Sequence, residues 1–232
     1  MTPERLGIEV DETRRVSGLW LQPSNAIACY VFAHGAGAGM EHPSMSVIAQ
    51  ELAEHGVATL RYQFPYMEQR SRRPDPPALC HRTVRAAVAA AARLAPDLPL
   101  FAGGRSFGGR MTSQAHAADR LPGVRGLIFF GFPLHPAKQP GAERAQHLFA
   151  VESPMLFLQG ARDELAHLSL LEPLIAQLGQ RARLRVLADA DHSFHAPART
   201  GRTDADIRAE ALDATIEWIR NVTRSSRPDH AS

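Results

Sequence analysis

One serine, Ser106, stands in the glycine-rich run FAGGRSFGGR at 101–110, directly after a hydrophobic segment. Its neighbours fit the pattern Gly-x-Ser-x-Gly, with Gly104 and Gly108 two positions to either side. This pattern is typical of a strand-to-helix turn that holds a nucleophilic serine in a strained backbone conformation. Both flanking positions need glycine because neighbouring backbone approaches too closely for a side chain. The pattern therefore predicts that Ser106 is a nucleophile.

Glycine-rich runs also bind phosphate groups, and this alternative applies at two places in the chain. The run at 101–110 lacks the lysine of a Walker phosphate loop, and Lys138 is the only lysine in the chain. The second run, HGAGAG at 34–39, does not have the spacing Gly-x-Gly-x-x-Gly of a dinucleotide site, and no acid ends the apolar run that follows at 57–64. We therefore predict that the protein uses no cofactor.

A serine hydroxyl is a weak nucleophile and needs a base, together with an acid that orients the base. In sites built on a strand-turn-helix elbow, the acid follows the serine along the chain and the histidine comes last. Asp163 follows a hydrophobic run at 154–160, just past the end of a predicted strand. We favour Asp163 as the orienting acid. Glu164 is the alternative, and one of the two would then cap the next helix.

The base is predicted in the polar turn DADHSFH at 189–195, which follows the last apolar run of the sheet. His192 is the favoured base, and His195 in the same turn is its alternative. The two could also form a metal pair, but no His-Glu-x-x-His or Cys-x-x-Cys spacing accompanies them. The other nine of the eleven histidines are scattered and are interpreted as structural or surface groups, so no metal site is predicted.

An acyl-transfer site also needs two N–H donors aimed at the developing oxyanion, each typically worth about 3 kcal/mol. The N–H of Phe107, the residue after the serine, is the predicted first donor. The second is expected from the small-residue loop at 34–39, where a substrate can touch the backbone. Ala36 is preferred there, and Gly35 is the next choice.

Short apolar runs alternate with helical patterns along nearly the whole chain, which is typical of a parallel sheet covered by helices. We predict an α/β fold with a mostly parallel twisted sheet, helices on both faces and an N-terminal antiparallel hairpin. The strands are expected at 6–10, 16–23, 29–35, 57–62, 98–104, 124–132, 154–160 and 182–188. The helices are expected at 44–55, 78–95, 107–119, 142–149, 165–179 and 203–223.

The one long irregular stretch, at 63–77, carries four prolines and three arginines. Loops of this length in compact domains are usually functional or mobile, and this one follows a strand of the parallel part, at the edge where open α/β sheets bind ligands. Candidate substrate-binding side chains are Tyr62, Phe64, Tyr66, Met67 and Arg105. Core or loop packing is the alternative for the first four, and surface pairing is favoured for Arg105 and Arg110.

The composition narrows the class of protein. With 232 residues, 44% of them hydrophobic, we expect a single domain at 1–224 and a flexible tail at 225–232. A net charge of +2 does not indicate a surface that binds nucleic acid. The basic stretch at 70–73 also lacks interleaved aromatic residues that could stack on bases. No apolar run approaches the roughly 18 residues that span a bilayer, and the charged N-terminus has no signal core.

Two cysteines, Cys29 and Cys80, are too few for a disulfide framework. A reduced, cytoplasmic setting is therefore predicted. The expected partner is a small-molecule substrate, without nucleic acid or membrane, and the expected assembly is a monomer or a homodimer.

The motifs HGAGAG, GGRSFGG, GARDE and DADHSFH occur in one order, and with them the chain resembles the α/β-hydrolase superfamily over its whole length. More narrowly, it is similar to the small, lidless branch of dienelactone-hydrolase-like and testis-expressed hydrolase-like proteins, through GGRS-x-GGR and DHSF. The resemblance implies a triad of Ser106, Asp163 and His192. Dienelactone hydrolases proper carry cysteine at the elbow, so Ser106 departs from their chemistry. Only 133–153 is available for a cap, so no large cap is expected.

These residues and the resemblance predict a serine hydrolase that cleaves a carboxylic ester or thioester through an acyl-enzyme intermediate. One alternative is a non-catalytic interaction module, because a fold does not by itself fix a function. Retention of all three triad residue types argues against that module. The other alternative is an acyltransferase that uses the same triad.

Overall fold

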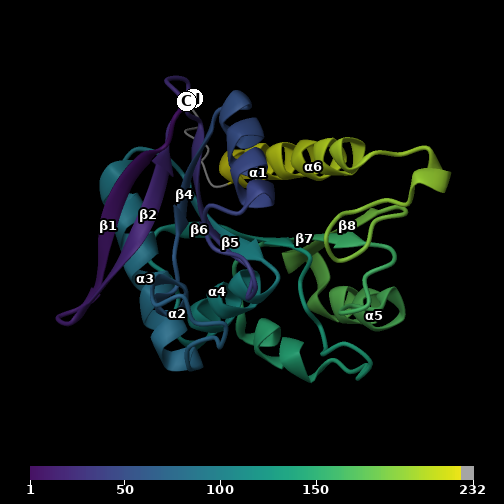
Figure 1. Cartoon of the computed structure of the whole chain (residues 1–232). Helices are drawn as coiled ribbons and strands as arrows, with labels where there is room; N and C mark the ends of the chain where they lie inside the picture. Colours follow the sequence, from purple (N-terminus) through teal and green to yellow (C-terminus); the bar gives the residue numbers. More distant parts are fainter. Residues whose placement is uncertain (226–232) are drawn as a thin grey trace, which may run out of the picture.

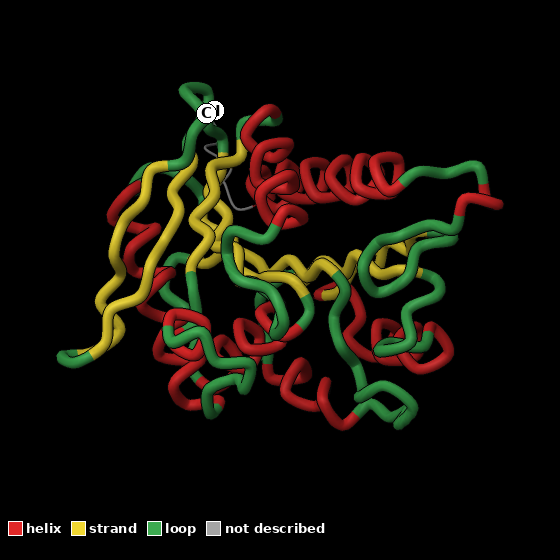
Figure 2. Tube along the Cα trace, viewed as in Figure 1, coloured by secondary structure: helices red, strands yellow, loops and turns green. Residues whose placement is uncertain are grey.

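An eight-stranded sheet forms the middle of the protein in the computed structural model, which describes residues 1–225 (Figures 1 and 2). The strands lie side by side in the order β1-β2-β4-β3-β5-β6-β7-β8. Their bounds are Glu4–Asp11 (β1), Arg14–Leu21 (β2), Ala28–Ala33 (β3), Val57–Tyr62 (β4), Leu100–Arg105 (β5), Val124–Phe130 (β6), Met155–Gly160 (β7) and Ala182–Leu187 (β8). Each predicted strand is present.

Strand pairing divides the sheet into a short antiparallel part and a long parallel part. β1 and β2 form the predicted hairpin, with Ile8 opposite Val16, and β2 also pairs antiparallel with β4. The remaining pairs, from β4-β3 through β7-β8, are parallel. The mostly parallel sheet is thus confirmed. Because its strands run in one direction, the loops that follow them meet at one edge, where α/β proteins bind ligands.

Helices cover both faces of this sheet, as predicted. Figure 1 shows α1 and α6 on one face and α3, α4 and α5 on the other. The helices are Pro43–Glu54 (α1), Pro65–Glu68 (α2), Pro77–Leu94 (α3), Phe107–Ala118 (α4), Leu168–Leu178 (α5) and Asp204–Ser225 (α6), with 3-10 helices at Glu143–Ala150 (η1), Gly179–Arg181 (η2) and Ala198–Thr200 (η3).

The core has two layers because the central strands carry apolar residues at successive positions. In β3, Cys29, Val31 and Ala33 join the core on one side, while Tyr30 and Phe32 join the core on the other. Side chains alternate between the faces of a strand, so only a continuous apolar run fills both layers. Burial of each large side chain stabilises the fold by about 1.5–3 kcal/mol.

The C-terminal helix α6 packs its apolar stripe against the sheet. The buried members of the stripe are Ile207, Ala211, Leu212, Thr215, Ile216 and Ile219, together with Trp218. The helix predicted at 203–223 is therefore confirmed. α6 continues to Ser225, and residues 226–232 of the predicted tail lie outside the described residues.

The segment at 142–149 was expected as an α-helix and is instead the 3-10 helix η1. Its buried residues are Ala145 and Leu148, and Val151, which follows η1, is buried as well. The N–H of Val151 donates to the carbonyl of Leu148 at 3.1 Å. A spacing of three places buried side chains on one face of a 3-10 helix, whereas an α-helix would rotate them apart.

Helix α5 begins three residues later than predicted, at Leu168. The preceding backbone is already engaged by other partners, because Leu165 donates its N–H to the Asp163 carboxylate at 2.7 Å. The carbonyl of Leu165 also accepts from the N–H of His135 at 3.0 Å. These long-range bonds delay the helix and fix the chain around Asp163.

The two cysteines are free and buried. Burial raises the pKa of Cys29 and of Cys80 to about 12, so both behave as small apolar groups. Among the helices at residues 1–225, none has an apolar stretch long enough to cross a membrane.

Candidate active site

Ser106 occupies a tight turn between β5 and α4. Its backbone has φ 48° and ψ −116°, in the left-handed half of conformational space that residues with a side chain rarely adopt. Such a conformation costs about 1–3 kcal/mol and persists only where the surrounding structure imposes it. The sequence pattern thus corresponds to a strained strand-to-helix elbow, which leaves the serine half-exposed at the carboxyl edge of the sheet.

Two glycines close this turn by letting backbone meet backbone. A Cβ on Gly104 would lie 2.5 Å from the carbonyl oxygen of Ala33, and a Cβ on Gly108 would lie 2.5 Å from the carbonyl oxygen of His34. Both distances are shorter than any real Cβ contact, so the end of β3 and the turn fit together only without side chains.

His192 reaches the serine from the loop that follows β8. Its Nε2 lies 2.8 Å from the Oγ of Ser106, and its Nδ1 lies 2.7 Å from Oδ2 of Asp163. A carboxylate only accepts, so Nδ1–H donates to Asp163 and Nε2 is left to accept the serine proton. The structure therefore brings the three predicted residues together in one hydrogen-bonded chain.

Asp163 is the buried end of this chain. Its side chain is 0% exposed, whereas that of His192 is 25% exposed. Three further contacts hold the carboxylate or its neighbours: Oδ1 accepts the Leu165 N–H, Oδ2 contacts the Gln159 amide nitrogen, and the Gln159 oxygen accepts from Phe132 N–H at 3.0 Å. Glu164, the alternative acid, is exposed.

Gln159 was not identified from the sequence, although it is the one polar side chain in the otherwise apolar strand β7. It is fully buried and joins the Asp163 carboxylate to the backbone that follows β6. A buried polar group needs a partner, so a lone glutamine in a central strand could have indicated a site.

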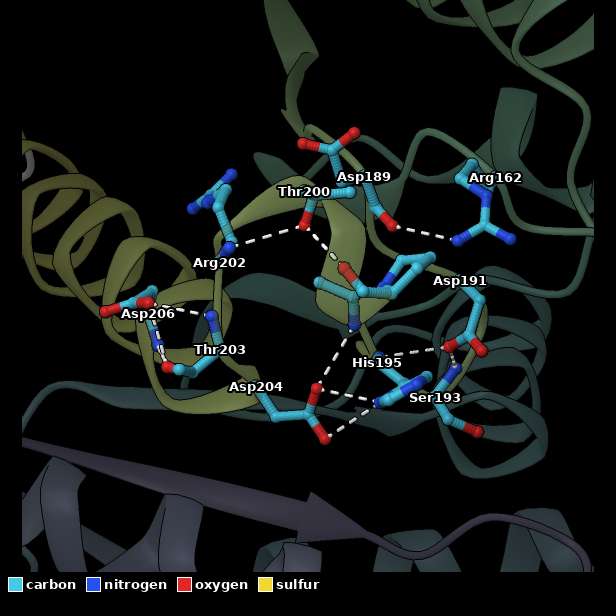
Figure 3. Close-up of polar contacts among 12 residues, drawn as sticks. Arg162, Asp189, Asp191, Ser193, His195, Thr200, Arg202, Thr203, Asp204 and Asp206 are labelled. Carbon is cyan, nitrogen blue, oxygen red and sulfur yellow. Dashed lines mark hydrogen bonds and ion pairs between the residues drawn. The ribbon is translucent and has the colours of Figure 1, made fainter.

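His195, the alternative base, is directed toward Asp204 (Figure 3). Its Nδ1 pairs with the carboxylate of Asp204 at 2.9 Å, and both side chains are more than half exposed. Asp191 ties the loop that carries both His192 and His195. Its Oδ1 accepts the N–H of Ser193 at 2.7 Å and that of His195 at 3.0 Å. These bonds shape the loop that presents His192.

Two of the predicted oxyanion donors, Phe107 and Gly35, lie beside the serine. Phe107 is the first residue of α4, so its N–H has no acceptor within the helix. A Cβ on Gly35 would lie 3.9 Å from the Cβ of Ser106, which places the 34–39 loop beside the nucleophile. The Tyr66 hydroxyl donates to the carbonyl of Ala36 at 2.8 Å and so fixes the peptide group after Ala36.

His34 holds this loop through hydrogen bonds from both of its ring nitrogens. Its Nδ1 donates to the carbonyl of Gly35 at 2.8 Å, and its Nε2 accepts the N–H of Phe64 at 3.0 Å. Burial lowers the pKa of His34 to about 4, so the ring is neutral at physiological pH. These contacts agree with the prediction that His34 is a structural or surface residue, and they make it a structural one.

The aromatic residues proposed to line a substrate pocket lie mainly in the core. Tyr62 and Phe64 are 0% exposed and Tyr66 is 1% exposed, whereas Met67 is half-buried. The rings of Phe64 and Tyr66 pack against Phe107, with ring centroids at 5.5 Å and 6.3 Å. These aromatic side chains therefore support the elbow from behind, and Met67 is the member of the set that retains exposed surface.

Arg105 and Arg110 were expected to form surface ion pairs, and within residues 1–225 neither does. The Arg105 guanidinium lies over the ring of Phe194 at 5.3 Å, with Nη2 3.4 Å from the carbonyl oxygen of His192. Burial lowers the pKa of Arg105, although Asp191 and Asp163 oppose that shift. Arg105 thus packs under the His192 loop.

The predicted irregular stretch 63–77 contains only the short helix α2 and leaves its three arginines at 70–73 exposed. The carboxylate of Asp75 accepts the N–H of Tyr66 at 2.8 Å, which ties the stretch back onto α2. No group of three or more His, Cys, Asp or Glu residues in the described chain is arranged to hold a metal ion.

A mostly parallel sheet with a strained serine turn between a strand and a helix is typical of the α/β hydrolases, and this chain has no large insertion between β6 and β7. The chain belongs to this family, because the model of the alpha/beta hydrolase domain matches residues 26–220.

Solved structures of similar proteins narrow the comparison. The dienelactone hydrolase of Anabaena variabilis is 22% identical, with a TM-score of 0.75 over 95% of this chain and 99% of that one. A serine hydrolase without lid from Xanthomonas campestris is 19% identical, with a TM-score of 0.72 over 94% and 95%. The esterase domain of a Rhodothermus marinus protein is 16% identical, with a TM-score of 0.72 over 95% and 99%. The predicted resemblance to lidless, dienelactone-hydrolase-like proteins is confirmed at the level of the fold.

Proposed function

We propose that this α/β hydrolase is a serine esterase or thioesterase in which Ser106, His192 and Asp163 form the catalytic triad. The proposal is supported above all by the two short contacts that join these residues, 2.8 Å from Oγ to Nε2 and 2.7 Å from Nδ1 to Oδ2. The strained turn supports it as well, because residues in strained backbone conformations cluster at active sites.

In the proposed reaction, the Oγ of Ser106 attacks the acyl carbonyl carbon while Nε2 of His192 takes the hydroxyl proton. The carbonyl oxygen becomes an oxyanion and is held by the N–H groups of Phe107 and Ala36, with Gly35 as the neighbouring donor. The bond to the leaving oxygen or sulfur then breaks, and His192 gives that group the proton. Water repeats the cycle on the acyl-enzyme and releases the acid.

Asp163 orients the imidazole in this proposal and stabilises the imidazolium ion that forms during each proton transfer. Its burial favours that role, because a carboxylate shielded from water acts more strongly on a neighbouring charge. Met67 is proposed as a substrate-facing side chain at this edge, and the substrate as a small molecule. Two free, buried thiols support a reducing, cytoplasmic setting.

A panel of p-nitrophenyl esters and acyl-CoA thioesters, assayed with wild type and Ser106→Ala, tests the proposal. The variant is expected to lose a factor of about 10⁶ in kcat on the best substrate. Ser193→Ala removes an exposed hydroxyl near His192 and is the matched control, expected to retain the wild-type rate. Equal rates for Ser106→Ala and wild type would remove the proposed nucleophile. Product analysis with added alcohol separates hydrolysis from acyl transfer.

A further inference from the structure

A hollow lies at the opposite edge of the sheet from Ser106, where the parallel strands β6, β7 and β8 begin. Its volume is about 860 Å³, within the range of small-molecule sites. The chain before β6, the start of β8 and the last turns of α6 bound it. Strands of six or seven residues rise by about 3.3 Å per residue, so the hollow is roughly 20 Å from the triad.

Arginine dominates the charge of this hollow. No aspartate or glutamate of the described residues lines it. The charged side chains that line it within the described part of the chain are those of Arg120, Arg125, Arg181 and Arg183. None of the four forms an ion pair within residues 1–225, whereas several arginines elsewhere do, such as Arg208 with Glu51 at 2.8 Å. Among residues 1–225, this part of the surface therefore holds a concentrated positive charge that no ion pair compensates.

Two arginines on β8 show that this charge is local. Arg183 and Arg185 are two residues apart and project from the same face of the strand. Arg185 pairs with Glu210 at 2.9 Å, in a neighbouring depression that is also lined by Asp206, Asp213 and Glu217. Acidic side chains thus neutralise one end of the strand, and no acidic side chain of the described residues pairs with Arg183 at the other end.

The hollow also has a fixed floor and one anchored arginine. Nη1 of Arg181 donates to the carbonyls of Val151 at 2.7 Å and Phe149 at 3.2 Å, which holds its guanidinium in place. The ring of Trp218 is 8% exposed and packs where a Cβ on Gly126 would lie 2.5 Å away. A ligand therefore meets the packed ring of Trp218 and the side chains of several arginines.

We propose that this arginine hollow binds a small molecule that carries a diphosphate group. Guanidinium groups pair their N–H donors with phosphate oxygens, and two linked phosphates supply enough negative charge and acceptors for several arginines at once. Inorganic pyrophosphate and a nucleoside diphosphate share this chemistry. The site is separate from the proposed triad and does not depend on the function of Ser106.

Calorimetric titration of the full chain with pyrophosphate, and separately with ADP, at low ionic strength tests this proposal. One saturable site is expected. Arg125→Gln and Arg183→Gln should each raise the Kd for pyrophosphate at least about tenfold, because a charged hydrogen bond is lost. Arg185→Gln, on the same face of the same strand, is the matched control and should leave the Kd within about twofold of wild type.

The two ligands distinguish the sources of the diphosphate group. Equal Kd values would assign the binding to the diphosphate alone, and tighter ADP binding would add a contribution from the nucleoside. Ser106→Ala should bind pyrophosphate as wild type does, so a failure of the proposed hydrolase function would not affect this test. Absence of saturable binding by folded wild type, or an equal loss in Arg185→Gln, would overturn the proposal. Circular dichroism checks that each variant is folded.

Discussion

The turn that carries Ser106 and the loop that carries His192 are built in opposite ways. The serine turn is buried on one side and closed by backbone contacts, and a Cβ on Gly108 would lie 2.5 Å from a carbonyl oxygen. The histidine loop is partly exposed, with Ser193 and His195 at the surface, and is tied by the carboxylates of Asp191 and Asp204. The nucleophile is therefore fixed by shape and its partner by hydrogen bonds. The two halves of the site should respond to different changes.

The largest effect is expected from adding one methyl group to the serine turn. Gly108→Ala forces β3 and the turn apart, and we expect it to lower the free energy of unfolding by more than about 3 kcal/mol. Urea denaturation measures this. Gly37→Ala in the neighbouring loop is the control, because a Cβ there meets nothing within 4 Å. Equal stability of the two variants would show that backbone packing does not close the turn.

The buried side of the serine turn should also keep the imidazole of His34 uncharged. His34 packs its carbonyl against Gly108, and burial lowers the pKa of its ring to about 4. An unfolded chain takes up this proton near pH 6.5, so between pH 6.5 and about 4 the unfolded state binds more protons than the folded state. The stabilisation present above pH 6.5 is therefore lost on acidification, by up to about 3 kcal/mol.

His34→Gln should flatten this decline, measured by urea denaturation at several pH values between 4.5 and 7. His55→Gln replaces an exposed histidine and should keep the wild-type slope. An unchanged slope in His34→Gln would contradict the assignment of a neutral, buried ring.

The smallest effect is expected in the histidine loop. Asp191→Ala removes the acceptor of two N–H groups that water can replace, so the free energy of unfolding should change by less than about 1 kcal/mol. Displacement of His192 should nevertheless lower kcat for ester hydrolysis by about tenfold. Asp191→Asn retains an acceptor oxygen and should restore most of the rate. A variant Asp191→Ala with full activity would show that the loop positions His192 without this carboxylate.

Local sequence patterns predicted the elements of the sheet well. The β4 bounds agree at both ends, because Val57–Tyr62 is an apolar run framed by Gly56, with φ 79°, and a proline-rich stretch. The turn at Ser106 was predictable for the same reason, since its glycines are adjacent in sequence to the serine that they serve. Helix α5 was placed too early because the bonds that delay it come from residues distant in sequence, such as His135.

The side chains around the active site were harder to predict, because their contacts also come from residues distant in sequence. An aromatic residue after a strand can face a substrate or the core, and Tyr62 and Phe64 lie in the core because α3 and α4 close over them. Arg105 was expected at the surface, yet it stacks on Phe194, which is 89 positions away in the chain. Residue types indicate what chemistry is possible, but long-range packing decides which side chains remain accessible.

Covalent labelling of Ser106 tests the central claim most directly. A fluorophosphonate should form a single adduct with the folded wild type, and peptide mass analysis should locate it on Ser106. Asp163→Asn should react about 10⁴-fold more slowly while remaining folded, because the imidazole loses its orienting partner. No adduct on folded wild type, an adduct on another serine, or equal rates for wild type and Asp163→Asn would contradict an activated serine at the elbow.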